Sequence, residues 1–131
     1  MLRAIAVVAL VVGLSSAIAA HHSPAAFDRT KRVTLTGTVK DFRWQNPHTW
    51  LEVDVPNASG AVETWVVEMT SPTYLVRAGW KSTSVKPGDK VSVVVNPVKA
   101  GDVRAGIFIE ITLPDGRKLG EQPARLGASA K

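Results

Sequence analysis

Apolar and polar residues alternate along several short segments of this chain, and this period of two constrains the fold more than any other feature. Successive side chains of a β-strand point to opposite faces, so each alternating segment predicts a strand with one buried face. In the first of them, Val33, Leu35 and Val39 share a face. Turn signals rich in Pro, Gly and Asn separate the segments, which predicts short connections. The segments are residues 33–39, 48–55, 62–70, 91–95 and 104–113.

The first strand carries an irregularity. Phe42 and Trp44 continue it, but they lie on the parity opposite to Val39. A change of parity needs an extra residue or a bend, and Gly37 lies beside it. We therefore expect a β-bulge or a bend near Gly37 in a long first strand.

One short helix is predicted between the third and fourth strands. Ser71 suits the N-cap, Pro72 the first helical position and Gly79 the left-handed position after the last turn.

Three strands, a helix and two strands follow the order of a five-stranded OB-like Greek-key barrel. The fold class is therefore all-β with one short helix. A small open β-sandwich fits the same spacing and remains the alternative. A short return arm over residues 117–119 follows the last strand.

The N-terminus has the features of a signal peptide. Arg3 precedes an apolar run over residues 4–14, and Ala17-Ile18-Ala19 forms an A-x-A cleavage site. We expect cleavage after Ala19, with Ala20 as the alternative, and no stable membrane anchor afterwards because the run is too short. The domains predicted are a signal peptide over 1–19, a barrel over 20–120 and a flexible tail over 121–131. The product is expected to be periplasmic or secreted.

Composition narrows the class of function. The chain has no cysteine, which excludes disulfides, thiolate metal sites and a lipoprotein anchor. Its formal charge is +5, but the basic residues are scattered among acidic ones, so we expect no nucleic-acid partner. No G-x-S-x-G, Walker or H-E-x-x-H motif occurs. We predict a binding protein and not an enzyme, with strand carboxylates such as Glu68 facing solvent.

Several motifs together resemble a known family. They are His21-His22-Ser23, the segment from Phe42 to His48 with its F-x-W-x-NPH pattern, Gly79-Trp80, and the segment 86–91. This combination resembles a family of small exported bacterial proteins known only as a domain of unknown function. The resemblance covers nearly all of the chain after the leader. It implies export and a single β-domain, it makes the histidine segments a hallmark, and it implies no activity.

Three histidines form the main chemical constellation, namely His21, His22 and His48. Cleavage after Ala19 would leave an amine, two amides and the His22 imidazole as an all-nitrogen square plane, which suits Cu(II) or Ni(II). Cleavage after Ala20 would instead let the amine and imidazole of His21 chelate together. His48 joins either site if the arm folds back over the first hairpin. Copper is thus the favoured ligand, and purely structural roles for the three histidines are the alternative.

Two tryptophans offer a second interpretation. Trp44 and Trp50 flank the Asn46-Pro47 turn, and Trp50 lies on the parity opposite to Leu51. Barrels of this type bind ligands on the second and third strands and adjoining loops. Trp44, Asn46 and Trp50 therefore form a candidate ligand-binding surface. In that case the protein is a metal-free module that binds an envelope protein or another ligand.

Overall fold

The computed structural model describes residues 24–122, which contain six β-strands, one α-helix and a short 3-10 helix. The predicted signal peptide, His21, His22 and most of the predicted tail lie outside the described residues. Within the described range, no helix has the length and apolar character needed to cross a bilayer. The elements are η1 (Pro24–Ala26), β1 (Val33–Arg43), β2 (Trp50–Pro56), β3 (Val62–Glu68), α1 (Pro72–Arg77), β4 (Lys90–Pro97), β5 (Ala105–Thr112) and β6 (Lys118–Gly120).

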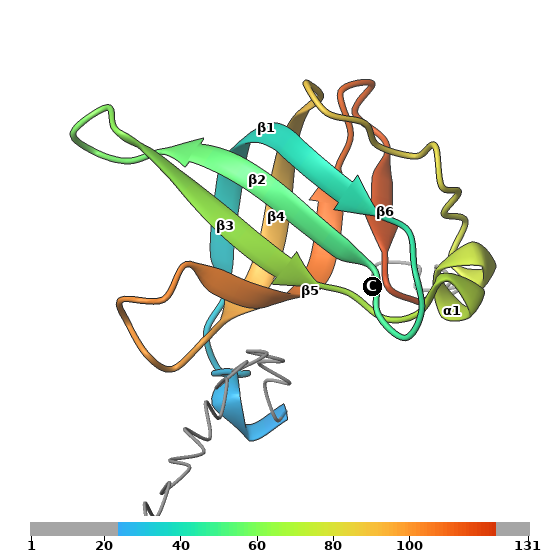
Figure 1. Ribbon diagram of the computed structural model, residues 1–131, viewed down its shortest axis with the longest axis horizontal. Helices are drawn as coiled ribbons and strands as arrows, with labels where there is room; N and C mark the ends of the chain where they lie inside the picture. The colour runs from blue at the N-terminus through green and yellow to red at the C-terminus, as the bar shows by residue number, and fades with distance from the viewer. Residues whose placement is uncertain (1–23, 123–131) are drawn as a thin grey trace, which may run out of the picture.

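The strands close into a barrel (Figure 1). Antiparallel pairing runs in the order β3-β2-β1-β4-β5, and a parallel pairing of β3 with β5 completes the ring. At this closing seam Val66 pairs with Ala105 and Glu68 with Ile107. The OB-like barrel is therefore confirmed, and the open sandwich is wrong. The return arm becomes β6, a short sixth strand that pairs with β5 outside the ring.

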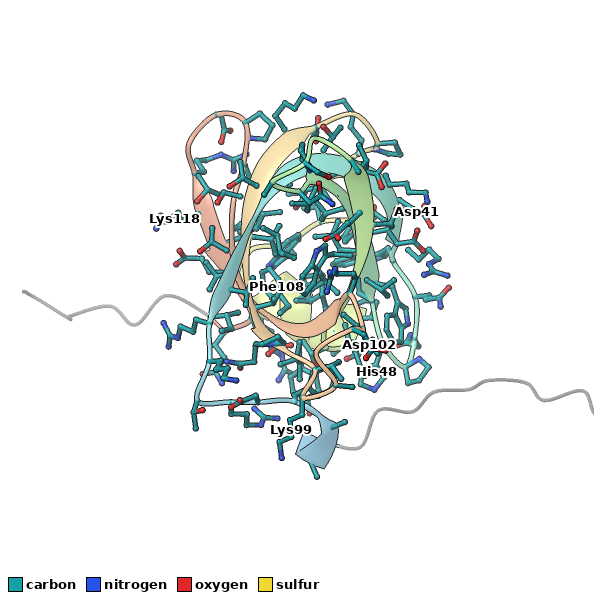
Figure 2. The ribbon with its side chains drawn as sticks, turned by 90° about the vertical axis from the view of Figure 1, so that its left-hand side faces the viewer. Asp41, His48, Lys99, Asp102, Phe108 and Lys118 are labelled. Atoms are coloured by element: carbon teal, nitrogen blue, oxygen red, sulfur yellow. The ribbon has the colours of Figure 1, made fainter. Side chains whose placement is uncertain are left out.

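The alternating apolar residues fill the barrel interior, as their parity requires. Figure 2 looks along the barrel: Phe108 points inwards, whereas Asp41 and Lys118 point outwards. Trp80 is 1% exposed and contacts Phe42 and Phe108, with ring centroids 6.0 and 5.5 Å apart. Its indole Nε1–H also donates to the Gly120 carbonyl, at 2.8 Å. Trp80 therefore joins β1, β5 and β6 in one core.

The change of parity in β1 comes from a bulge at Lys40. Val39 pairs with Val53 and Asp41 with Glu52, so Lys40 is the extra residue. We expected the irregularity beside Gly37, which instead has a different role. A Cβ atom at Gly37 would lie 2.1 Å from the Asp54 carbonyl oxygen, so β1 and β2 approach closely there. Gly37 is required for that close approach.

The helix begins and ends where the sequence predicts. Ser71 has extended backbone angles at the N-cap, although its side chain makes no capping hydrogen bond. Gly79 is left-handed, with a φ of 92°. The Gly79 N–H donates to the Val76 carbonyl and the Trp80 N–H to the Leu75 carbonyl, which is the Schellman pattern. This turn directs Trp80 from the helix end into the core.

Candidate functional site

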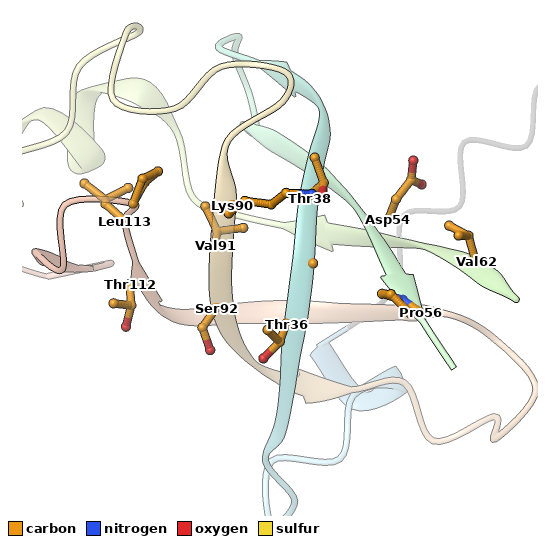
Figure 3. A pocket seen from close by; sticks show the side chains of 12 residues that line it. Thr36, Thr38, Asp54, Pro56, Val62, Lys90, Val91, Ser92, Thr112 and Leu113 are labelled. Atoms are coloured by element: carbon orange, nitrogen blue, oxygen red, sulfur yellow. Dashed lines mark hydrogen bonds between the residues drawn. The ribbon is translucent and has the colours of Figure 1, made fainter. Parts of the chain in front are cut away.

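A large hollow on the described surface carries little free chemistry. It is an open groove of about 840 Å³ over β1, β4 and the ends of β2, β3 and β5 (Figure 3). Its charged side chains are Asp54 and Lys90, and both already make hydrogen bonds within the protein. Asp54 accepts from the Thr64 hydroxyl, at 2.6 Å, and Lys90 donates to the Thr38 hydroxyl. The other lining groups are hydroxyls, backbone and apolar side chains.

A smaller hollow, of about 160 Å³, contains His48 and two carboxylates. We call it the His48 pocket; its lining residues are His48, Glu68, Met69, Thr70, Ile107 and Glu121. His48 lies in the loop between β1 and β2, directly after a cis Asn46-Pro47 peptide bond. This pocket brings together β3, the start of β5 and the residue that follows β6.

The contacts of His48 define which ring nitrogen carries the proton. Its Nδ1 lies 3.0 Å from the Met69 carbonyl oxygen and 3.3 Å from Glu68 Oε1. A carbonyl and a carboxylate only accept hydrogen bonds, so Nδ1 must be the donor. In the neutral imidazole the lone pair then lies on Nε2. The His48 side chain is 42% exposed, so a ligand can reach the imidazole ring that carries this nitrogen.

We expected Glu68 to face solvent, but its side chain is largely buried. Its side chain is 14% exposed; its neighbours are Trp50 of β2 on one side and Ile107 of β5 across the closing seam on the other. Parity correctly places it outside the barrel, but parity cannot show that His48 and Glu121 lie over that part of the outer face. The Glu68 Oε2 atom is buried and has no hydrogen-bond partner.

Glu121 follows β6 and brings the second carboxylate to the pocket. Its Oε1 accepts a hydrogen bond from the Thr70 backbone N–H, at 2.9 Å. Burial raises the pKa of the Glu121 carboxyl above its ordinary value, although the Thr70 N–H and the charge of Arg29 oppose the shift. The nearby Glu68 charge adds to the increase. Glu121 belongs to the segment predicted as a tail, yet it packs against the barrel.

This raised pKa makes the stability depend on pH. The folded state holds the Glu121 proton more tightly than the unfolded state. The protonated Glu121 carboxyl therefore contributes fully to stability when the pH is below its ordinary pKa of 4.5. This contribution is lost as the pH rises through the raised pKa. Glu121→Gln keeps an acceptor for Thr70 but cannot ionise. We expect its Tm to exceed that of the wild type at pH 7, with the margin narrowing towards pH 4.5. A half-exposed control, Glu110→Gln, which loses only an ion pair with Lys118, should show no such gain. A margin for Glu121→Gln that is independent of pH would contradict the explanation.

The N-terminal segment is fixed close to this pocket. Phe27 is buried in a small cluster with Val98 and Ala105, and Ile107 packs against that cluster. Ile107 also lines the His48 pocket, so it connects the two. In addition, the positive charge of Arg29 interacts with the Glu121 carboxyl and lowers its pKa. The described start of the chain is therefore linked to the His48 pocket through Ile107.

The tryptophan surface comes together only in part. Trp50 is half-buried, and its ring centroid lies 6.5 Å from that of His48. Trp44 instead packs on Phe42, with centroids 5.9 Å apart, and is partly buried against the main core. Asn46 is exposed in the intervening loop. Trp50 is thus part of the surroundings of the His48 pocket, while Trp44 stabilises the loop.

No cluster of three or more His, Asp or Glu side chains within residues 24–122 is placed to hold a metal ion by itself. His48 is the one histidine in this range. A three-histidine site therefore depends on His21 and His22, which lie outside the described part of the chain. Sequence reasoning missed Glu68 and Glu121 as pocket residues. One signal in the sequence bears on Glu68: it lies next to Met69, close to the end of the predicted third strand.

Comparisons with known proteins give one structural likeness and one family. A mitochondrial single-stranded DNA-binding protein from S. cerevisiae is 12% identical over 63% of this chain and 92% of its own, with a TM-score of 0.43. The search of curated proteins finds no match. A family model matches residues 8–108, which is most of the chain and includes the F-x-W-x-NPH segment. The chain therefore belongs to the family of unknown function DUF6152.

Proposed function

We propose that this protein is an exported metal-binding protein, periplasmic or secreted, whose ligand is a transition-metal ion with copper favoured. His48 Nε2 and the imidazoles of His21 and His22 would supply nitrogen ligands. One observation carries the proposal: the two acceptors around His48 hold the proton on Nδ1 and leave the lone pair on Nε2.

The surroundings of His48 match the requirements of a metal ligand. Histidines that bind metals donate their other ring N–H to a carbonyl or carboxylate, which fixes the tautomer and makes the ligand more basic. His48 has both kinds of acceptor, the Met69 carbonyl and the Glu68 carboxylate. Imidazole nitrogens suit copper, and an all-nitrogen set favours Cu(II).

The position of the N-terminal segment also supports a shared site. Pro24 is the first described residue, and Phe27 is buried in the cluster that reaches the His48 pocket through Ile107. Three extended residues span about 10 Å, which is the reach available to His21 from Pro24. A shared site requires His48 to lie within this reach of the N-terminal segment.

Isothermal titration with Cu(II) tests the proposal. The protein is exported with its natural leader, and mass spectrometry verifies the mature N-terminus before titration. We expect sub-micromolar binding by the wild type and binding at least about tenfold weaker in His48→Ala. Even the loss of a group that only hydrogen-bonds to a metal-ligating histidine lowers metal affinity by about 10–100-fold. Gln45→Ala, an exposed position in the same loop, serves as the matched control and should bind like the wild type.

Three outcomes would separate the alternatives. Tight binding that survives His48→Ala removes His48 and leaves a site made by the N-terminal segment alone. Loss of binding both in His48→Ala and in a His21→Ala, His22→Ala variant supports the shared site. If the wild type does not bind copper or another transition metal, the proposal fails. The metal-free module based on Trp50 then takes its place.

A further inference from the structure

The first half of β1 has a partner strand on one edge only. Its residues Val33 to Gly37 pair with β4, whereas the pairing of β1 with β2 begins at Thr38, opposite Asp54. β2 ends at Pro56, which has no N–H to donate. Within the described residues, the edge of this half of β1 that faces away from β4 therefore lacks a strand. Such an edge is a template on which another chain can pair.

The alternation of the backbone identifies the free groups on this edge. The Val39 N–H donates to the Asp89 carbonyl on the β4 side, at 2.9 Å. Successive residues of a strand direct their N–H and C=O groups to opposite edges, so Thr34 and Thr36 direct theirs away from β4. Thr38 has the same orientation and meets β2. Thr34 and Thr36 are exposed, and along this edge they offer two donors and two acceptors.

The large groove borders the same edge. Its lining includes Thr36 and Gly37 of β1, and Pro56 and Val62 of the hairpin formed by β2 and β3. In Figure 3, Pro56 and Val62 lie on the side of β1 away from β4. Val62 is 63% exposed, the highest value among the large hydrophobic side chains of the described residues. The free backbone edge thus has an uncovered apolar wall beside it.

We propose that this edge and groove bind an extended peptide segment of a partner protein, which pairs with Thr34 and Thr36 as an added antiparallel strand. Donors and acceptors at the spacing of a strand are matched by another extended backbone, and pockets for alternate side chains give specificity. The wall formed by Pro56 and Val62 favours an apolar side chain. Arg32 extends the edge, is exposed and has no ion pair within residues 24–122, so it favours an acidic residue.

The groove offers little to a charged small ligand. Its two charged side chains, Asp54 and Lys90, already bond to hydroxyls of neighbouring strands. Its free hydrogen-bonding capacity near β2 therefore lies in the backbone of β1, which favours a peptide. The proposal does not depend on the metal site.

Nuclear magnetic resonance titration with a synthetic peptide tests the proposal. The probe is acetyl-Thr-Val-Thr-Val-Thr-Val-Glu-amide, whose C-terminal glutamate would lie beside Arg32 in the antiparallel orientation. We expect chemical-shift changes at the Thr34 and Thr36 amides and at the Val62 methyl groups. Hydrogen exchange at the two amides should slow by about tenfold near saturation, because the peptide protects both donors.

Thr36→Pro removes the donor that faces the open edge and leaves the N–H groups that face β4. Proline is tolerated at such positions of edge strands, and we expect the peptide to bind at least about tenfold more weakly. Thr36→Val, which keeps the N–H, is the matched control and should bind like the wild type. Should Thr36→Pro fail to fold, Arg32→Glu provides a second test at an exposed position. It should weaken binding about two- to fivefold, and a probe ending in lysine should restore it.

The named outcomes either support or overturn the proposal. Unchanged Thr34 and Thr36 amides at millimolar peptide would overturn it, as would shifts confined to other surfaces. Undiminished binding by a folded Thr36→Pro variant would show that the main chain does not pair. If the same amides shift with protein concentration alone, the edge binds a second copy of this chain, and the peptide proposal is wrong.

Discussion

Gly37→Ala is expected to destabilise the barrel by about 3 kcal/mol or more, which is at or beyond the upper end of typical overpacking costs. The added Cβ would lie 2.1 Å from the Asp54 carbonyl oxygen and 2.9 Å from its carbonyl carbon. Both are backbone atoms of β2, so no flexible side chain can move aside. β1 and β2 would have to separate at the point where β1 also pairs with β4 through Val91.

Urea unfolding followed by circular dichroism measures this effect. Gly101→Ala is the matched control, because a Cβ there meets nothing within 4 Å. Its free energy of unfolding should differ from the wild type by less than about 0.5 kcal/mol, the range typical of surface substitutions. A Gly37→Ala variant as stable as Gly101→Ala would show that the strands do not approach as closely as the structure shows.

Trp80→Ala is expected to cost about 3–5 kcal/mol, the usual range for a large buried aromatic side chain. Trp80 is 1% exposed, and its ring contacts Phe42 and Phe108. A domain of this size has only about 5–15 kcal/mol of total stability, so the variant should be partly unfolded at 37 °C. Denaturant unfolding measures the loss, and a loss below about 1 kcal/mol would contradict the assignment of Trp80 to the core.

Trp80→Phe isolates the contribution of the indole N–H. The ring stacking is largely retained, but the 2.8 Å bond to the Gly120 carbonyl is lost. We expect a smaller loss than for Trp80→Ala, since a single hydrogen bond contributes about 0.5–1.5 kcal/mol. Because Glu121 follows Gly120, this variant should also weaken the contact of Glu121 with Thr70. Faster hydrogen exchange at the Thr70 amide would reveal that loosening.

The predictions that depend on local patterns agree closely with the structure. The alternation of apolar residues determines which side chains enter the barrel, since backbone geometry alone fixes the period of two. The same holds for the helix, where Pro72 and Gly79 act within a few residues of their own position. The irregularity of β1 was expected, but its place was not. Parity shows that a residue must be extra, yet the pairing with β2 decides that it is Lys40.

The candidate site depends on long-range contacts that no local pattern contains. Thr70 and Glu121 are 51 positions apart, and they meet because β6 returns along β5 while β3 closes the ring. The chemistry of His48 makes it a candidate from sequence alone, whereas parity predicts Glu68 as an ordinary outward-facing strand residue. The sequence by itself determined the faces of the strands and the ends of the helix, because those depend on neighbouring residues. Tertiary structure alone decided which outward residues became buried, because burial depends on what the closing of the barrel brings over them.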